Sequence, residues 1–214
     1  ANPITRPSEF HERCTGLLTP AIILVRPQMG ENIGAAARGM RNFGLSEMRL
    51  VAPRDGWPNP KAVATASGAG RVLDAARVHG TTAEAIADCH TVYATTARPR
   101  DLIKPVLTPE AAMAEARGLI AAGQKVGFLF GPERAGLQND DLAGAQAIVS
   151  VPVDPEFASL NLAQCVLLLA YEWGWGGSDQ PAREDPEPAT RVEMEKLGDR
   201  WEDALDDAGF FFPD

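Results

Sequence analysis

The sequence predicts an α/β fold in which helices cover both faces of a mainly parallel sheet. Short runs of apolar and β-branched residues alternate along the chain with longer segments that carry helical signals. This order implies βαβ units, which build parallel sheets. Ligands of such sheets bind beyond the carboxyl ends of the strands, so we expect a site in the loops at those ends.

The first half of the chain contains three predicted strands and two predicted helices. Ala21–Val25 (AIILV) is entirely apolar, which is typical of a buried strand. A helix is predicted over Ile33–Phe43, and Gly44 ends it. The other elements of this half are a strand over Met48–Val51, a helix over Thr81–Asp88 and a β-rich run at Thr91–Thr95.

The second half continues the alternation. Pro109–Ala121 is predicted to be a helix, because its first residue is proline and the threonine before it can cap the first turn. Val126–Phe130 and Ala147–Val151 are predicted strands. The last helix of this half, Ser159–Trp173, is apolar on most of its faces and is therefore expected to be buried.

The start of that last helix carries two polar residues. Ser159 is predicted to be its N-cap, because a hydroxyl can accept a hydrogen bond from a first-turn N–H group. Asn161 has no such explanation. Polar groups at the end of a buried helix need partners, and a ligand is one partner that Asn161 could have.

Residues 1–177 are expected to form one domain, residues 178–190 a linker rich in proline and charge, and residues 191–214 an amphipathic helix. The apolar stripe of that helix contains Met194, Leu197, Trp201 and Leu205. An isolated helix of this kind must pack on something. Docking on its own domain or on a sister subunit is favoured over docking on a separate partner.

Composition favours a cytoplasmic protein without a membrane segment. No apolar run approaches the roughly 20 residues that span a bilayer. The three cysteines (Cys14, Cys89 and Cys165) and three histidines have no metal-binding or disulfide spacing, so no metal is expected. Of the net charge of −9, residues 179–214 carry −8, which leaves the body nearly neutral and able to present a local basic patch.

Loops at strand ends carry the candidate chemistry. The first spans residues 26–38 and leads into a helix on which Arg38, Arg41 and Asn42 lie opposite Ala36 and Met40. The polar residues of that face could bind phosphate or be merely solvated. The second, residues 131–137, has flanking glycines, and its adjacent glutamate and arginine could simply form an exposed pair. The third is the segment from residue 151 to the start of the last helix, which carries Ser159 and Asn161. Another strand-end loop, residues 95–100, contains two threonines and two arginines and would suit an anionic partner.

Taken in order, three motifs resemble a known family. They are NxGAAARxMxNFG (residues 32–44), FGPERAGL (130–137) and PxxxSLNLA (155–163). They resemble the SpoU branch of the SPOUT RNA methyltransferases, and within it the TrmJ type of tRNA 2′-O-methyltransferase. Neither GxGxxG nor GxxxxGK[ST] is present, which argues against a nucleotide-dependent oxidoreductase or hydrolase.

The resemblance implies a SPOUT-type sheet whose C-terminal part forms a trefoil knot around S-adenosyl-L-methionine. It implies a homodimer that methylates a ribose 2′-hydroxyl in RNA. By similarity to the TrmJ type, the expected target is the tRNA anticodon loop, at a position-32 type of site. The alternatives are ribosomal RNA methylation and a non-catalytic RNA-binding protein of the same fold. By position, cofactor contacts are expected at Thr95, Thr96, Ala97, Gly131, Gly136, Val151, Ala158, Ser159 and Leu160.

The resemblance also implies catalytic roles for Asn32, Arg38, Glu133, Ser159 and Asn161. Methyl transfer from a sulfonium requires alignment of three atoms and removal of a weakly acidic ribose proton. The family role of Arg38 is to assist that deprotonation from the other subunit. Because a guanidinium resists losing its proton, we expect it instead to bind phosphate and stabilise the developing alkoxide. The expected RNA contacts are Arg26, Arg38, Arg41, Arg98 and Arg100.

Overall fold

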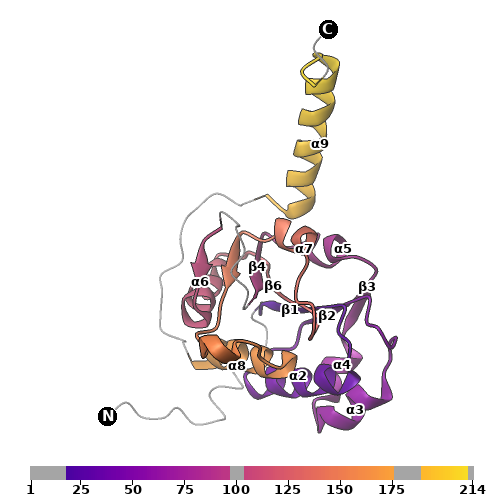
Figure 1. Ribbon diagram of the computed structural model, residues 1–214, viewed down its shortest axis with the longest axis vertical. Helices are drawn as coiled ribbons and strands as arrows, with labels where there is room; N and C mark the ends of the chain where they lie inside the picture. The colour runs from indigo at the N-terminus through magenta and orange to yellow at the C-terminus, as the bar shows by residue number, and fades with distance from the viewer. Residues whose placement is uncertain (1–17, 97–103, 176–188, 212–214) are drawn as a thin grey trace.

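The computed structural model describes residues 18–96, 104–175 and 189–211, and contains one seven-stranded sheet in which every pair of neighbouring strands is parallel (Figure 1). The predicted α/β class with a parallel sheet is therefore confirmed. The strand order is β3-β2-β1-β6-β4-β7-β5. The strands are β1 (Ala21–Val25), β2 (Met48–Val51), β3 (Arg77–His79), β4 (Thr91–Thr95), β5 (Val106–Leu107), β6 (Val126–Phe130) and β7 (Ala147–Val149).

Helices cover both faces of the sheet, as Figure 1 shows. One face packs against α2 (Gly30–Asn42), α3 (Pro60–Ala66), α4 (Gly70–Asp74), α6 (Pro109–Ala121) and α8 (Leu162–Trp175). The other face packs against the two short helices α5 (Thr82–Ile86) and α7 (Asn139–Ala143). The larger core therefore lies on the side of α2 and α8.

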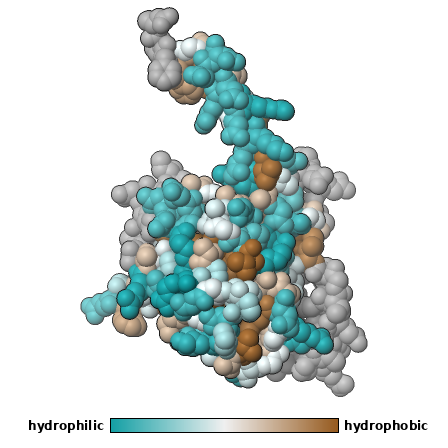
Figure 2. Space-filling model, turned by 90° about the vertical axis from the view of Figure 1, so that its right-hand side faces the viewer, coloured by the Kyte–Doolittle hydropathy of each residue, from teal (hydrophilic) through white to brown (hydrophobic). Residues whose placement is uncertain are grey.

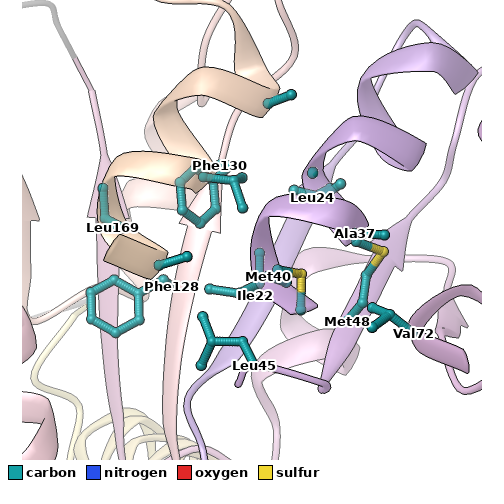
Figure 3. Close-up of a cluster of buried hydrophobic side chains, with 14 of the residues drawn as sticks. Ile22, Leu24, Ala37, Met40, Leu45, Met48, Val72, Phe128, Phe130 and Leu169 are labelled. Atoms are coloured by element: carbon teal, nitrogen blue, oxygen red, sulfur yellow. The ribbon is translucent and has the colours of Figure 1, made fainter. Parts of the chain in front are cut away.

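Strand β1 shows why the sheet is apolar on both faces. Its side chains alternate, so Ile22 and Leu24 enter the larger core while Ile23 and Val25 enter the smaller one. All of them are completely buried. Figure 3 shows how Ile22 and Leu24 meet Met40 of α2 and the rings of β6 in the larger core. Each such side chain stabilises the fold by roughly 1.5–3 kcal/mol through burial.

Charged groups at the amino end of the sheet form a closed cluster. Arg49, near the start of β2, is 2% exposed. Its guanidinium donates to Glu47 and Asp88 and, at 2.6 Å, to the carbonyl of Ala85. Lys125 adds a further hydrogen bond to Asp88 at 3.1 Å. We call Arg49, Glu47, Asp88 and Lys125 the amino-end cluster.

The amino-end cluster changes the ionisation of its members. Burial alone would raise the pKa of the Asp88 carboxyl, but the hydrogen bonds and charges of Arg49 and Lys125 outweigh it and lower the pKa to about 2. Burial raises the pKa of the neighbouring Cys89 thiol to about 12. Asp88 is therefore a carboxylate and Cys89 a neutral thiol at pH 7.

The C-terminal helix α9 (Arg191–Asp207) forms as predicted, and the backbone nitrogen of its first residue donates to the carbonyl of Cys89 at 3.3 Å, but its apolar stripe does not pack on the described body. It extends away from the body in Figure 1, and its apolar residues Met194, Leu197 and Trp201 are 50–69% exposed. On the face drawn in Figure 2, α9 is largely hydrophilic and the body shows only small separate apolar patches. Thr190 caps the helix in a capping box with Glu193, which supports it without tertiary packing. The predicted linker, residues 178–190, lies almost wholly outside the described residues.

Several element boundaries differ from the prediction. Helix α2 begins at Gly30, three residues earlier than expected, and β7 ends at Val149, two residues earlier. The short elements β3, β5, α3, α4 and α7 were not predicted. Of these, α3 has a sequence signal: the side chain of Asn59 accepts hydrogen bonds from two first-turn N–H groups, and proline follows it.

Candidate functional site

The predicted site loops meet because the strands that they follow are neighbours. Strands β6, β4 and β7 lie side by side, and β1, which leads into α2, pairs with β6. Their carboxyl ends open into a cavity of about 250 Å³. It is lined by Thr95, Thr96, Phe130, Gly131, Pro132, Glu133, Arg134, Gly136, Val149, Val151, Ala158, Ser159, Leu160, Leu162 and Cys165.

Every predicted cofactor contact that the structure describes lines this cavity; Ala97 lies outside the described residues. The structure thus brings the predicted set together, while its binding role stays a prediction. The lining residues that sequence reasoning did not single out are Phe130, Pro132, Arg134, Val149, Leu162 and Cys165. Cys165 could have been found from helical spacing, since it lies one turn beyond Asn161. Burial raises the pKa of its thiol to about 11, so it is neutral at pH 7.

Two glycines shape the loop after β6. A Cβ atom on Gly131 would lie 2.3 Å from the backbone nitrogen of Leu137, closer than any side chain can approach. Gly136 has a φ of +69°, which glycine adopts without strain. The loop can therefore fold back on itself, and this places its backbone against the cavity.

Glu133 fastens this loop to the start of α2. Its carboxylate accepts hydrogen bonds from the backbone nitrogens of Gln28 at 2.9 Å and Met29 at 3.2 Å, and from Asn32 Nδ2 at 2.8 Å. A helix N-terminus favours such a negative group, and α2 has no side-chain cap of its own. An exposed pair between Glu133 and Arg134 is therefore not what the structure shows.

The same chain of hydrogen bonds continues to α8. Asn32 is 7% exposed, and its Oδ1 accepts from Nδ2 of Asn161 at 3.0 Å. The Oδ1 of Asn161 then accepts from the backbone nitrogens of Ala163 at 2.9 Å and Gln164 at 3.4 Å. We call Glu133, Asn32 and Asn161 the polar chain.

The polar chain corrects the prediction for the start of α8. The helix begins at Leu162, so Asn161 is its N-cap and Ser159 is not. Asn161 needs no ligand to explain it, because its amide is satisfied by Asn32 and by the first turn of the helix. Ser159 lies three residues before the helix, and its exposed side chain lines the cavity.

Arg38 and Arg41 lie on the exposed face of α2, opposite the buried Ala36 and Met40, as the periodicity predicted. Neither arginine has a hydrogen bond or ion pair within the described part of the chain. Arg38 is absent from the lining of the cavity in its own subunit. The structure therefore does not bring Arg38 together with the other predicted catalytic residues of the same chain.

Arg26 has a different environment from that expected of an RNA contact. Its guanidinium forms an ion pair with Asp141, which is 4% exposed and also accepts hydrogen bonds from the Thr82 hydroxyl at 2.6 Å and the Gln138 nitrogen at 2.8 Å. Burial would raise the pKa of Asp141, but these partners, Arg26 first, lower it overall. Arg26 thus joins β1 to α7. Arg98 and Arg100 lie outside the described residues.

No group of three or more histidine, cysteine, aspartate or glutamate side chains is arranged to hold a metal ion in the part of the chain that the structure describes. Within the same residues, every helix is too short or too polar to cross a bilayer.

Comparison with known proteins points to one family. Residues 19–171 match the model of the SpoU rRNA methylase family. The chain is 45% identical over 151 residues to the tRNA (cytidine/uridine/adenosine-2′-O-)-methyltransferase TrmJ of Pseudomonas aeruginosa; this match covers 71% of the chain but only 58% of that protein. It is 37% identical over 201 residues to TrmJ of Klebsiella pneumoniae, covering 90% of the chain and 81% of that protein.

A solved structure supports the same relationship. The crystal structure of TrmJ from Z. mobilis ZM4 is 57% identical to the chain and superimposes with a TM-score of 0.80. The match covers 91% of the chain and 83% of that structure.

Proposed function

The chain belongs to the SpoU methylase family, with TrmJ enzymes among its relatives, and we propose on this basis that it is an S-adenosyl-L-methionine-dependent RNA (ribose-2′-O)-methyltransferase acting on tRNA. The observation that carries the proposal is the polar chain, which joins all three family motifs beside one cavity. The anticodon loop is the proposed target, by resemblance to TrmJ.

The cavity fits the proposed cofactor. Its volume of about 250 Å³ is near the lower end of the roughly 300–1,000 Å³ typical of small-molecule sites, and one side is open. Apolar residues such as Phe130 and Leu162 can contact adenine, while the hydroxyl of Ser159 and backbone groups of the glycine loop offer hydrogen bonds. When bound, S-adenosyl-L-methionine supplies an electrophilic methyl group.

The polar chain positions groups in this proposal and does not react. Both oxygens of the Glu133 carboxylate, and the amides of Asn32 and Asn161, already have partners inside the protein. Their contribution is to hold the glycine loop, α2 and α8 at fixed distances, which orients bound substrates. Ser159 remains available to contact cofactor or ribose.

Arg38 provides the proposed contact with RNA at the reacting ribose. Its free, exposed guanidinium can bind a phosphate through two hydrogen bonds and stabilise negative charge on the 2′-oxygen. Arg41 lies one turn further along the same face and is the proposed neighbouring phosphate contact. Together they offer a local basic patch on a chain of net charge −9.

We propose that the active form is a homodimer in which Arg38 serves the cavity of the partner. Helix α8 exposes Leu167, Leu168, Tyr171 and Trp175, the last at 75%. This apolar face lies beside α2, because Leu167 contacts Gly39. An apolar face of this kind is typical of an interface between subunits, and burying it between two copies would place Arg38 at the edge of the interface.

Mixed dimers test this arrangement. Arg38→Ala and Gly131→Ala, which obstructs the cavity loop, are expected to be inactive separately. When they are produced together, dimers containing one of each have one complete site, so about a quarter of wild-type activity should return. If Arg38 served its own subunit, no activity would return. Circular dichroism and sedimentation of each variant check that fold and dimer are intact.

The catalytic proposal itself is tested by mapping 2′-O-methyl groups in tRNA and ribosomal RNA incubated with the purified chain and cofactor. A methyl group on the tRNA anticodon loop is expected, and Arg38→Ala should remove it. If only ribosomal RNA were methylated, ribosomal RNA and not tRNA would be the substrate. Absence of cofactor binding in calorimetry would favour a non-catalytic RNA-binding protein.

Three further features belong to the proposal. By family resemblance, the segment Val151–Leu160 and α8 form part of a trefoil knot, which backbone tracing in an experimental structure would test.

Residues 1–177 form the catalytic domain, so that fragment should still bind cofactor. The protein is cytoplasmic, which the free thiols of Cys89 and Cys165 support and fractionation of cells would test.

A further inference from the structure

One charged side chain of the cavity has no partner within the described ranges of the chain. Arg134 lies in the glycine loop after β6, lines the cavity and is exposed. It makes no hydrogen bond or ion pair with any residue that the structure describes. Among the described lining residues it is the one with a basic side chain.

The adjacent carboxylate does not neutralise Arg134. Glu133 directs its two oxygens to the backbone of Gln28 and Met29 and to the side chain of Asn32. Glu133 is the one acidic residue in the described lining, and it is thus committed to α2. The cavity therefore offers a bound molecule one uncompensated positive charge, at its open side.

The other lining residues that the structure describes are uncharged. Its polar side chains are the hydroxyls of Thr95, Thr96 and Ser159 and the neutral thiol of Cys165. The deeper residues, such as Phe130 and Leu162, are apolar and buried. A ligand with an apolar ring system and one anionic end would place the ring inside and the anion at Arg134.

From this arrangement we infer that Arg134 binds the carboxylate of the methionine part of S-adenosyl-L-methionine. This inference rests on the proposed function. The carboxylate is the sole anionic group of the cofactor, and a guanidinium can hold it with two parallel hydrogen bonds. The cofactor then lies with adenine in the apolar depth and its amino-acid end at the open side.

Two ligands that differ in one group test the inference. S-adenosylhomocysteine carries the carboxylate, and S-adenosyl-3-thiopropylamine is the same molecule without it. Calorimetry on the full chain should show that Arg134→Gln weakens S-adenosylhomocysteine about tenfold, as expected for an exposed charge-assisted pair. The affinity for the decarboxylated ligand should not change. Arg134→Lys should retain part of the preference for S-adenosylhomocysteine over the decarboxylated ligand, since lysine keeps the charge but not the planar guanidinium.

Arg54→Gln is the matched control. Arg54 is an exposed arginine in the field of Glu133, but it pairs with Asp55 and does not line the cavity. Removing its charge should leave both affinities unchanged. Equal weakening of the two ligands by Arg134→Gln would overturn the inference, because it would indicate damage to the loop. Unchanged cofactor binding with weaker tRNA binding and a smaller salt dependence would also overturn it, in favour of a phosphate contact.

The inference can fail while the proposed function stands. If the wild-type chain binds both ligands equally well, the cofactor site is present but Arg134 does not recognise the carboxylate. If the wild-type chain binds neither ligand, the proposed function itself is wrong.

Discussion

The two ends of the sheet both gather polar side chains from strands far apart in the sequence, but they differ in whether those side chains have partners. At the amino end, Arg49 is enclosed by carboxylates and a carbonyl, and every charge of the amino-end cluster has a counterpart. At the carboxyl end, the polar chain is equally well satisfied, yet Arg134 and Ser159 face a cavity without partners in the described structure.

The contrast shows that strongly shifted pKa values do not by themselves locate the site. Asp88, whose pKa is lowered to about 2, and Arg49, the most buried arginine among the described residues, both lie at the amino end, away from the cavity at the carboxyl end. Such shifts are also typical of structural ion-pair networks. Unsatisfied groups facing a cavity identify the functional end better.

Replacing the central arginine of the amino-end cluster should have the largest effect on stability. Arg49→Met leaves Asp88 without its main partner, which should lower the free energy of unfolding by about 3 kcal/mol. Urea denaturation measures this loss. Methyl transfer per folded molecule should be unchanged, and a stable but inactive variant would show that the two ends are coupled.

Replacing the carboxylate of the polar chain should have the opposite effect: the methylation rate should fall strongly and the free energy of unfolding only moderately. Glu133→Gln keeps the shape but has one oxygen for three donors, so the glycine loop and α2 should shift relative to each other. We expect the methylation rate to fall about 100-fold, as for other small misplacements of reacting groups. The unfolding free energy should fall by about 1–2 kcal/mol. A loss of stability without a loss of rate would contradict the positioning role.

The two polar residues before α8 form a matched pair of variants. Asn161→Ala removes an N-cap and the bond to Asn32, and should cost about 1–2 kcal/mol in thermal or urea unfolding. Ser159→Ala removes no bond within the described structure and should change stability by less than about 0.5 kcal/mol. If Ser159→Ala lowered the stability more than Asn161→Ala did, Ser159 would be the N-cap of α8 after all.

The stability that Asp88 contributes should depend on pH in the acid range. The pKa of Asp88 is about 2 in the folded protein, below its ordinary value of 3.8, so its stabilisation is complete above about pH 4 and is lost as the pH falls toward 2. Because the side chain is 37% exposed, we expect a loss of only about 1 kcal/mol. Urea unfolding at several pH values measures it. Arg49→Met should abolish this part of the pH dependence, and an unchanged slope would assign it to other carboxylates.

The sequence predicted the parts of the fold that have strong local signals. Strands β1 and β6 are continuous apolar runs, β2 and β4 are short runs dominated by apolar and β-branched residues, and α6 begins with a capping threonine and proline. The edge strands β3 and β5, of three and two residues, are too short to show a periodicity. The order of the three family motifs along the chain predicted that the start of α2, the glycine loop after β6 and the start of α8 would meet.

The partners within the site could not be predicted from the sequence. That Asn161 rather than Ser159 caps α8 depends on where the helix begins, and this is fixed by the amide of Asn32 from a distant segment. The pairing of Arg26 with Asp141 likewise depends on α7, which has only five residues. Both are tertiary contacts between residues more than 100 positions apart.

The polar chain also determines when the protein can become active during its synthesis. Asn32 and Asn161 are separated by 129 positions, and Cys165, at the far wall of the cavity, is made later still. The sheet and α2 can begin to assemble as the chain leaves the ribosome, since domains fold from the N-terminal side during translation. A nascent chain nevertheless lacks the bond from Asn161 to Asn32 until the start of α8 has been made, so the polar chain and the cavity beside it cannot be complete before then.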